Sequence, residues 1–406
     1  MASMGGEGPR LSTDLTGTHD ESLPELRVAL FTGNYNYIKD GVALTLNRLV
    51  AFLLKRGVAV LVFAPAGPVA AFEPAGELVP VPSMAIPGRS EYRIALGFPA
   101  AARLRLADFR PTLIHIAVPD ILGYKALRYA KRQGLPVVAS FHTRYDTYFR
   151  FYGAGFLERM ATAYLRWFYK RCRRVYPPSP SMADIIRQEG MSDHIEVWAR
   201  GVDSGLFSPA RRDPSWRRSL GIGADDVVIN FTGRLVKEKN TDLAVRVLTL
   251  LKKRGVAFRA LFTGDGPERK AMQAALPDAL FPGFLHGEEL ARAYASSDIF
   301  FFPSESETFG NVTLEAMASG LPAVNALASG SNSLVVPGET GFIEPARDAG
   351  ALADRLELLV HDGALRSCMG EKARQRALTF SWDAILAGLL DSYRQVLVET
   401  GRGRGA

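Results

Sequence analysis

Short apolar runs alternate with segments of helical spacing along almost the whole chain, and this alternation constrains the fold more than any other feature. An apolar run, a helix and a second apolar run are typical of parallel strands joined by a crossover helix. The candidate elements of the N-terminal half are strands at residues 27–32, 58–64, 112–116 and 136–141 and helices at 42–55 and 122–132. The sequence therefore predicts an α/β fold with parallel sheets.

The same alternation restarts after a segment rich in Gly, Ser and Pro at residues 198–209. The candidate elements of this half are strands at residues 227–231, 257–262, 298–302 and 322–325 and helices at 241–254, 267–275 and 311–319. Two such halves predict two doubly wound, Rossmann-like domains that face each other across a ligand cleft at the carboxyl ends of their strands.

We expect five parts along the chain, because the composition changes where they would join. They are a flexible leader at 1–24, an N-terminal domain at 25–197, a hinge at 198–209, a C-terminal domain at 210–378 and a last part at 379–406. The last part begins with a predicted helix, Trp382–Glu399, which is long enough to cross back over the N-terminal domain, and it ends in a flexible tail.

Composition narrows the class of protein. Of 406 residues, 47% are apolar and 22% charged, which excludes a disordered chain, a coiled coil and a collagen-like fibre. The sequence contains no run of about 18 apolar residues, so a membrane-spanning helix is not predicted. Cys172 and Cys368 are the only cysteines, so we expect neither a disulfide framework nor a zinc site, and a reducing cytoplasm as the compartment. The absence of any Asp-x-Asp pattern argues against a metal-clamped diphosphate.

The strongest motif is PSESETFGNVTLEAMASGLP at residues 303–322, where a buried strand is followed by a loop and a helix. The free N–H groups and positive dipole of a helix N-terminus suit a phosphate, and Gly310 allows close approach to the backbone. Glu307 and Glu315, eight residues apart, can accept hydrogen bonds from sugar hydroxyls. Either glutamate alone is more often an ordinary loop or helix residue; the whole string favours a binding site.

Three further strand ends carry candidate site residues. Arg234 and Lys239 in FTGRLVKEKN can neutralise a diphosphate. Gly41, after Asp40 and before Val42, opens the first helix and can place backbone N–H groups over the same phosphates. His142 in SFHTR stands at a strand end where a functional side chain is expected, whereas a mid-strand histidine such as His115 is more often a core residue.

Positive charge and aromatic residues gather in one segment of the N-terminal half. Residues 141–175 hold eight of the 49 basic residues, two of the 42 acidic ones and 11 of the 40 aromatics. A helix predicted over residues 155–174 would align four basic residues, and an upstream stretch, 89–110, holds five arginines. The candidate membrane or acceptor residues are Arg89, Arg93, Arg159, Arg166, Lys170 and Arg173. Such a surface suits anionic lipid headgroups; a solvated basic face over an aromatic core is the alternative, and no nucleic-acid motif accompanies the charge.

These motifs, together with TGDGP and RGVDSGLFSP, resemble in order and spacing those of the retaining glycosyltransferases of family 4, over about residues 25–395. The motif sequences are most similar to those of the sulfolipid synthases and bacterial α-mannosyltransferases of that family. One departure is Asp40, where the family often has a second glycine. The resemblance implies the GT-B fold, in which two facing Rossmann-like domains hold a UDP- or GDP-sugar mainly on the C-terminal domain, with no cofactor required.

The resemblance also implies the roles of the candidate residues. His142, Arg234 and Lys239 match the family's donor-sugar histidine and diphosphate pair, and act as the catalytic set. The donor-binding set, which includes the E-x7-E glutamates, is Gly41, Val42, Glu307, Phe309, Gly310, Asn311 and Glu315. A metal ligand is not expected. Attack on the sugar from the face of the leaving group would retain its configuration.

We therefore expect a hexosyltransferase that acts on a lipid of the diacylglycerol, phosphoinositide or ceramide type. It would be a cytoplasmic protein held peripherally on the inner face of the plasma membrane. The same reaction on a soluble or polysaccharide acceptor is the alternative. A dehydrogenase is disfavoured because no G-x-G-x-x-G follows the first strand, and a non-catalytic sugar-binding protein would lack Arg234 and Lys239.

Overall fold

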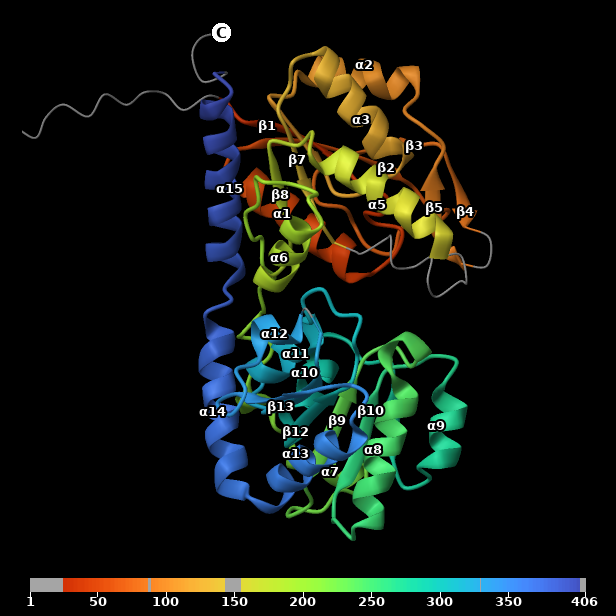
Figure 1. The fold of residues 1–406 in the computed structure, drawn as a ribbon, viewed down its shortest axis with the longest axis vertical. Helices are drawn as coiled ribbons and strands as arrows, with labels where there is room; N and C mark the ends of the chain where they lie inside the picture. Colours follow the sequence, from red (N-terminus) through yellow and green to blue (C-terminus); the bar gives the residue numbers. More distant parts are fainter. Residues whose placement is uncertain (1–24, 87–88, 143–154, 329, 402–406) are drawn as a thin grey trace, which may run out of the picture.

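The computed structural model describes residues 25–86, 89–142, 155–328 and 330–401. Figure 1 shows two lobes, one above the other, each built around a sheet. We call the half that holds the first sheet the N-terminal lobe and the half that holds the second sheet the C-terminal lobe. The predicted leader at 1–24 lies outside the described residues.

The first sheet has six strands that all pair in parallel. They are β1 (Arg27–Phe31), β2 (Ala59–Pro65), β3 (Glu77–Val81), β6 (Leu113–Ile116), β7 (Val137–Ser140) and β8 (Arg174–Tyr176). Their order is β3-β2-β1-β6-β7-β8, so the winding reverses between β1 and β6. Ligands of open α/β sheets bind outside the carboxyl ends of the strands at such a reversal.

The second sheet repeats this topology with a separate set of strands, again all parallel. They are β9 (Val228–Thr232), β10 (Arg259–Thr263), β11 (Leu280–Gly283), β12 (Ile299–Phe302), β13 (Ala323–Ala326) and β14 (Gly341–Glu344). The order β11-β10-β9-β12-β13-β14 puts the reversal between β9 and β12. All four residues of β6 and all four of β12 are buried, as expected for sheets covered by helices on both faces.

Helices follow most strands and cover the two sheets (Figure 1). In the N-terminal lobe they are α1 (Gly41–Lys55), α2 (Ala100–Phe109), α3 (Ile121–Arg132), α5 (Gly155–Tyr169) and α6 (Pro180–Gln188). In the C-terminal lobe they are α7 (Pro214–Ser219), α8 (Thr241–Lys253), α9 (Arg269–Ala275), α10 (Gly287–Ala295), α11 (Asn311–Ala318), α12 (Ser331–Leu334), α13 (Ala349–His361) and α14 (Gly363–Leu378). The prediction of two parallel-sheet, Rossmann-like domains is confirmed.

The last helix, α15 (Trp382–Glu399), begins and ends at the predicted residues and packs against the N-terminal lobe. Figure 1 shows it running along the upper lobe while α14 runs along the lower one. Its apolar side chains, including Leu390 and Val396, join the same buried cluster as Val28 of β1. The Tyr393 hydroxyl also lies 2.6 Å from Nδ1 of His115, which is fully buried, so His115 is a core residue as predicted.

The predicted helix over residues 155–174 is too long. Helix α5 ends at Tyr169, and Arg174 instead enters β8, where it pairs with Val138 of β7. Lys170 and Arg173 therefore lie beyond the helix, and only Arg159 and Arg166 share its surface. The upstream arginines also lie on an unexpected element, because Arg89 and Arg93 belong to β5 (Arg89–Ala95), which pairs antiparallel with β4 (Ser83–Ile86).

Two chain passages connect the lobes. Val202, in the predicted hinge, forms an isolated parallel β-bridge with Ser381, just before α15. The N–H of Val202 donates to the carbonyl of Phe380. The domain boundaries given above stay predictions.

Across the described ranges, no helix combines the length and the apolar character needed to cross a membrane.

Candidate functional site

A cavity of about 860 Å³ lies between the lobes and is lined by residues of both. It opens at the carboxyl ends of the strands. Its walls include Gly233 and Gly264, which directly follow β9 and β10, as well as His142, two residues after β7, and Phe302, the last residue of β12. The structure brings all ten residues of the predicted catalytic and donor-binding sets into this one cavity. They are Gly41, Val42, His142, Arg234, Lys239, Glu307, Phe309, Gly310, Asn311 and Glu315. Their individual roles stay predictions.

Two helix N-termini face each other across the cavity. Helix α1 begins at Gly41. Asp40 caps this helix, because its carboxylate accepts a hydrogen bond from the Ala43 N–H at 2.8 Å. Helix α11 begins at Asn311, and no side chain of the described residues caps it. A Cβ placed on Gly41 would lie 3.4 Å from Asn311 Nδ2, so the two helix starts are close neighbours. The uncapped N–H groups at the start of α11 make that start a favourable place for an anion, whereas at the start of α1 the Asp40 carboxylate already accepts one N–H.

Glycines bring the backbone close to the cavity at two points. Gly310 precedes α11 with φ of 98°, a left-handed conformation that glycine adopts without a steric penalty. Gly264, after β10, has φ of 138°, and a Cβ there would lie 2.0 Å from the Gly233 carbonyl oxygen. Only glycine fits where these two strand ends meet, so the TGDGP and FTGR motifs are needed for the shape of the wall.

The predicted diphosphate pair is engaged with carboxylates. Lys239 Nζ lies 2.5 Å from Glu307 Oε1, and both side chains are more than four-fifths buried. The Ser304 hydroxyl donates to the same Glu307 oxygen at 3.1 Å. Arg234 is about half exposed and pairs with Glu238, four residues further along. An anionic ligand entering the cavity would therefore compete with Glu307 and Glu238 for the two cations.

Glu315 lies one turn deeper and is half-buried. Its Oε2 accepts a hydrogen bond from the Tyr294 hydroxyl at 3.1 Å, which partly offsets the cost of burying the carboxylate. Burial raises the pKa of Glu315 to about 7, so the protonated form is substantially populated at neutral pH. Tyr294, on α10, was not predicted, since no local sequence pattern links it to the E-x7-E motif.

Glu315→Gln should change how the free energy of unfolding depends on pH. The folded pKa is about 7 and the unfolded value 4.5, so the folded state holds the extra proton between these values. This carboxyl group therefore lowers stability as the pH rises from about 4.5 to 7. We expect a smaller loss over that window in Glu315→Gln, measured by urea unfolding at a series of pH values. Glu371→Gln, at an exposed residue of α14, is the matched control, and equal pH dependence in the two variants would contradict the assignment.

His142 is buried in the cavity wall, two residues after β7. Its Nδ1 lies 2.7 Å from an Arg200 guanidinium nitrogen, and among the described residues Nε2 has no hydrogen-bond partner. Burial, with the Arg200 charge second, holds the pKa of His142 well below its ordinary value. Arg200 also lines the cavity but was not predicted as a site residue; the only sequence signal is an arginine within the Gly- and Ser-rich hinge motif.

The loop after β12 contacts the N-terminal lobe directly. The Thr308 hydroxyl donates to the His142 carbonyl at 3.2 Å, and the Ser179 hydroxyl donates to the Thr308 carbonyl at 2.9 Å. Because Thr308 follows Glu307, these bonds connect the E-x7-E loop to the strand end that carries His142.

The candidate membrane residues lie outside the cavity. Arg159, Arg166, Lys170 and Arg173 are exposed, although Arg166 Nε donates to the Glu189 carbonyl at 2.9 Å. The Arg93 guanidinium donates to the hydroxyl and the carbonyl of Ser83 across the β4–β5 hairpin, so part of its hydrogen-bonding capacity holds the hairpin together. The side chain of Arg89 lies outside the described side chains.

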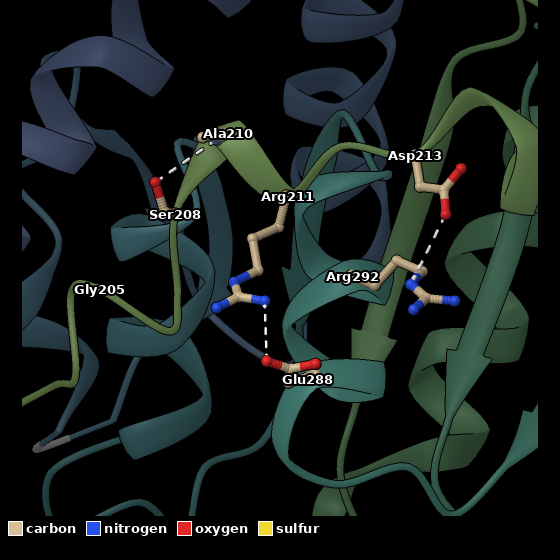
Figure 2. A pocket seen from close by; sticks show the side chains of 7 residues that line it. All are labelled: Gly205, Ser208, Ala210, Arg211, Asp213, Glu288 and Arg292. Carbon is tan, nitrogen blue, oxygen red and sulfur yellow. Dashed lines mark hydrogen bonds and ion pairs between the residues drawn. The ribbon is translucent and has the colours of Figure 1, made fainter.

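A second pocket, of about 420 Å³, lies in the C-terminal lobe beside the predicted hinge (Figure 2). Its charged groups pair within the pocket: Arg211 with Glu288 at 3.3 Å and Arg292 with Asp213 at 3.7 Å. Figure 2 shows both pairs bridging the wall of this pocket. None of the predicted site residues lines it, and its charges already compensate one another.

Comparison with known proteins gives consistent matches to both halves. Residues 39–206 match the family model described as Glycosyltransferase Family 4, and residues 212–376 match Glycosyl transferases group 1. A GDP-mannose-dependent alpha-mannosyltransferase of Mycobacterium tuberculosis is 34% identical, over 91% of this chain and 97% of that protein. A sulfoquinovosyl transferase of Arabidopsis thaliana is 33% identical, over 69% of this chain and 56% of that protein. A sucrose-phosphate synthase of Thermosynechococcus elongatus, 19% identical, superposes with a TM-score of 0.76 over 92% of this chain and 100% of that one.

Proposed function

We propose a donor, a mechanism and an acceptor from the premise that this chain belongs to glycosyltransferase family 4. It is a nucleotide-sugar glycosyltransferase with the GT-B fold, so the resemblance seen in the sequence is confirmed. The proposed reaction moves a hexose from a UDP- or GDP-sugar, with retention of configuration, to a lipid of the diacylglycerol, phosphoinositide or ceramide type. GDP-mannose is the first donor to test, because the mycobacterial relative is named for it.

The meeting of ten predicted residues in one cavity is the observation that carries the donor assignment. In this proposal Arg234, Lys239 and the N-termini of α1 and α11 hold the diphosphate. The same groups stabilise the negative charge that grows on it as the sugar departs. Glu307 and Glu315 bind hydroxyl groups of the donor, and His142 contacts the hexose.

The surroundings of the two glutamates favour attack from the face of the leaving group over a covalent intermediate. A glycosidase-type nucleophile needs a carboxylate that is free to attack the anomeric carbon. Glu307 is held by Lys239 and Ser304, and half-buried Glu315 is held by the Tyr294 hydroxyl. In the proposed step the bond from the anomeric carbon to the diphosphate oxygen breaks while the bond to the acceptor oxygen forms. The acceptor's hydroxyl proton passes to the departing diphosphate.

Apolar and basic groups on the N-terminal lobe support a lipid acceptor. Leu44 of α1 lines the cavity and is half exposed, so an apolar group can be reached from the donor site. Elsewhere on the lobe, Met84 on β4, Ile94 on β5 and Met160 on α5 are exposed by 38 to 69%. A lobe that exposes both basic and apolar side chains suits a surface that rests on anionic headgroups, at about 1 kcal/mol per basic residue. We place the protein peripherally on the inner face of the plasma membrane.

The protein should bind vesicles that contain anionic lipid and not purely zwitterionic ones. Charge attraction supplies part of the affinity, so raising the salt to about 0.5 M should reduce pelleting with the vesicles. Changing Arg159, Arg166, Lys170 and Arg173 together to Gln should reduce it again. The matched control changes four exposed basic residues of the C-terminal lobe to Gln, namely Arg218, Lys253, Lys270 and Lys372, and should pellet like the parent protein.

The alternative is the same reaction on a soluble or polysaccharide acceptor. Equal pelleting with neutral and anionic vesicles, or equal losses in the two four-residue variants, would leave the basic residues as a solvated face and favour this alternative.

A further inference from the structure

The contact between Arg200 and His142 determines which ring nitrogen of the histidine carries a proton. Arg200 donates from one terminal guanidinium nitrogen to Nδ1 of His142 at 2.7 Å. A guanidinium has five N–H donors and no acceptor, so Nδ1 must be the unprotonated, accepting nitrogen. Burial lowers the pKa of Arg200 only to about 9, so it remains a cation at neutral pH. A neutral His142 ring therefore carries its proton on Nε2.

That Nε2–H is a buried donor without a partner among the described residues. His142 is only 6% exposed, and it lines the cavity between the lobes. A buried donor left without an acceptor costs free energy that a ligand oxygen can recover. The arrangement is therefore suited to an oxygen of a ligand bound in the cavity, such as a sugar hydroxyl.

Arg200 is itself held in place by the segment that connects the lobes. Its other terminal nitrogen donates to the Trp198 carbonyl at 2.8 Å, and the guanidinium carbon lies 4.7 Å from the centre of the Trp198 ring. Trp198 also packs edge-on against His142, with 5.8 Å between ring centroids. The titratable and charged groups that face His142 are Arg200 and, from β6, His115, whose own pKa burial lowers to about 3. His115 is thus neutral at neutral pH, and Arg200 provides the only fixed charge among these groups.

We propose that Arg200 is a positioning residue that holds His142 as a neutral ring with Nε2–H presented to the donor sugar. This inference rests on the proposed contact between His142 and the hexose. Its consequence is that His142 serves as a hydrogen-bond donor and not as a base, in agreement with a leaving diphosphate that takes the acceptor's proton. Arg200 acts through His142. The loss of Arg200 therefore leaves the Nε2–H donor of His142 present but misplaced.

Nitrogen-15 NMR of histidine-labelled protein tests the protonation state without any assay of activity, with the His142 signals assigned by comparison with His142→Ala. We expect a protonated Nε2 and an unprotonated Nδ1 that do not titrate between about pH 5 and 8. In Arg200→Met the donor and the charge are gone, so Nδ1 becomes free to take a proton and the pKa of His142 should rise. Arg200→Lys keeps a charged donor and should restore the parent behaviour in part. A proton on Nδ1 in the parent protein would overturn the proposal, even if Arg200→Met failed to fold.

Kinetics test the consequence for the reaction. We expect Arg200→Met to lower kcat/KM by about 10-fold, less than the loss of a whole donor. His142→Gln, whose amide nitrogen falls near Nε2, should retain more activity than His142→Asn, whose amide falls near Nδ1. Arg217→Gln removes an equally buried arginine from the C-terminal lobe and should leave the His142 signals unchanged. Higher activity in His142→Asn than in His142→Gln would contradict the proposal. So would an Arg200→Met protein in which the tautomer of His142, its pKa and the reaction rate are those of the parent protein. Full activity of His142→Ala would instead remove the proposed hexose contact while leaving the NMR result intact.

Discussion

Lys239→Ala should lower turnover by at least about 100-fold, the scale of losing one preorganised donor to a developing charge. Only 18% of the Lys239 side chain is exposed, and its ammonium group lies beside the Glu307 carboxylate in the wall of the cavity. A cation in such a place interacts with a diphosphate more strongly than one in open solvent does. Steady-state kinetics with a saturating nucleotide sugar measure the effect.

Lys237→Ala is the matched control for this variant. Lys237 lies on the same short 3₁₀ turn, Lys237–Lys239, but is exposed and does not line the cavity. It should keep turnover close to that of the parent protein, and both variants should unfold at similar temperatures. Parent-like turnover in Lys239→Ala would remove Lys239 from the diphosphate site.

Glu307→Ala should be nearly as damaging as Lys239→Ala, whereas Glu307→Gln should retain partial activity. The amide of Gln keeps an oxygen that can accept from a sugar hydroxyl and from Ser304, while Ala keeps none. The loss of the charge also leaves Lys239 without its partner at 2.5 Å, so the effect of Gln should include weaker control of the lysine's position. We expect losses of about 100-fold for Ala and about 10-fold for Gln, measured as kcat/KM.

Glu305→Ala is the control for the loop, because Glu305 is exposed two residues earlier and does not line the cavity. It should be close to the parent protein. Mass spectrometry of the protein after mixing with donor separates the two mechanisms. A hexose covalently attached to Glu307 or Glu315 would overturn the same-face mechanism, and equal rates for Glu307→Ala and the parent would remove Glu307 from the site.

The predicted strands and helices agree with the structure where the apolar pattern and the local stop signals are strong. Buried strands such as β9 and β12 appear as apolar runs that end at a glycine or proline, and α15 shows the helical pattern over its whole length. The edge strand β3 and the β4–β5 pair were missed. Every residue of β3 and β4 except Val81 is half-exposed or exposed, and these strands carry no clear alternation.

The basic segment shows why other parts of the fold could not be predicted from the sequence. The helical period continues from Arg159 through Arg173 in the sequence, yet α5 ends at Tyr169. The chain turns there because Arg174 and Val175 complete the sheet beside β7. That pairing joins residues more than 30 positions apart, and no local pattern reports it.

The candidate site divides in the same way. Residues that follow strand ends, such as Arg234 and His142, could be predicted because the topology places every strand end at one edge of the sheet. Arg200 contacts His142 and Tyr294 contacts Glu315, although the partners lie 58 and 21 positions apart in the chain. Side chains that meet only in the folded protein leave no pattern in the sequence around them.

Product analysis tests the central claim, the transfer of a hexose to a membrane lipid, most directly. The protein would be incubated with GDP-mannose, and separately with UDP-glucose, in the presence of vesicles that contain anionic lipid and each candidate acceptor. We predict a hexosylated lipid by mass spectrometry, released nucleoside diphosphate in equal amount, and an α linkage by NMR that shows retention. Transfer only to water-soluble sugars, or a β-linked product from an α-linked donor, would contradict the account.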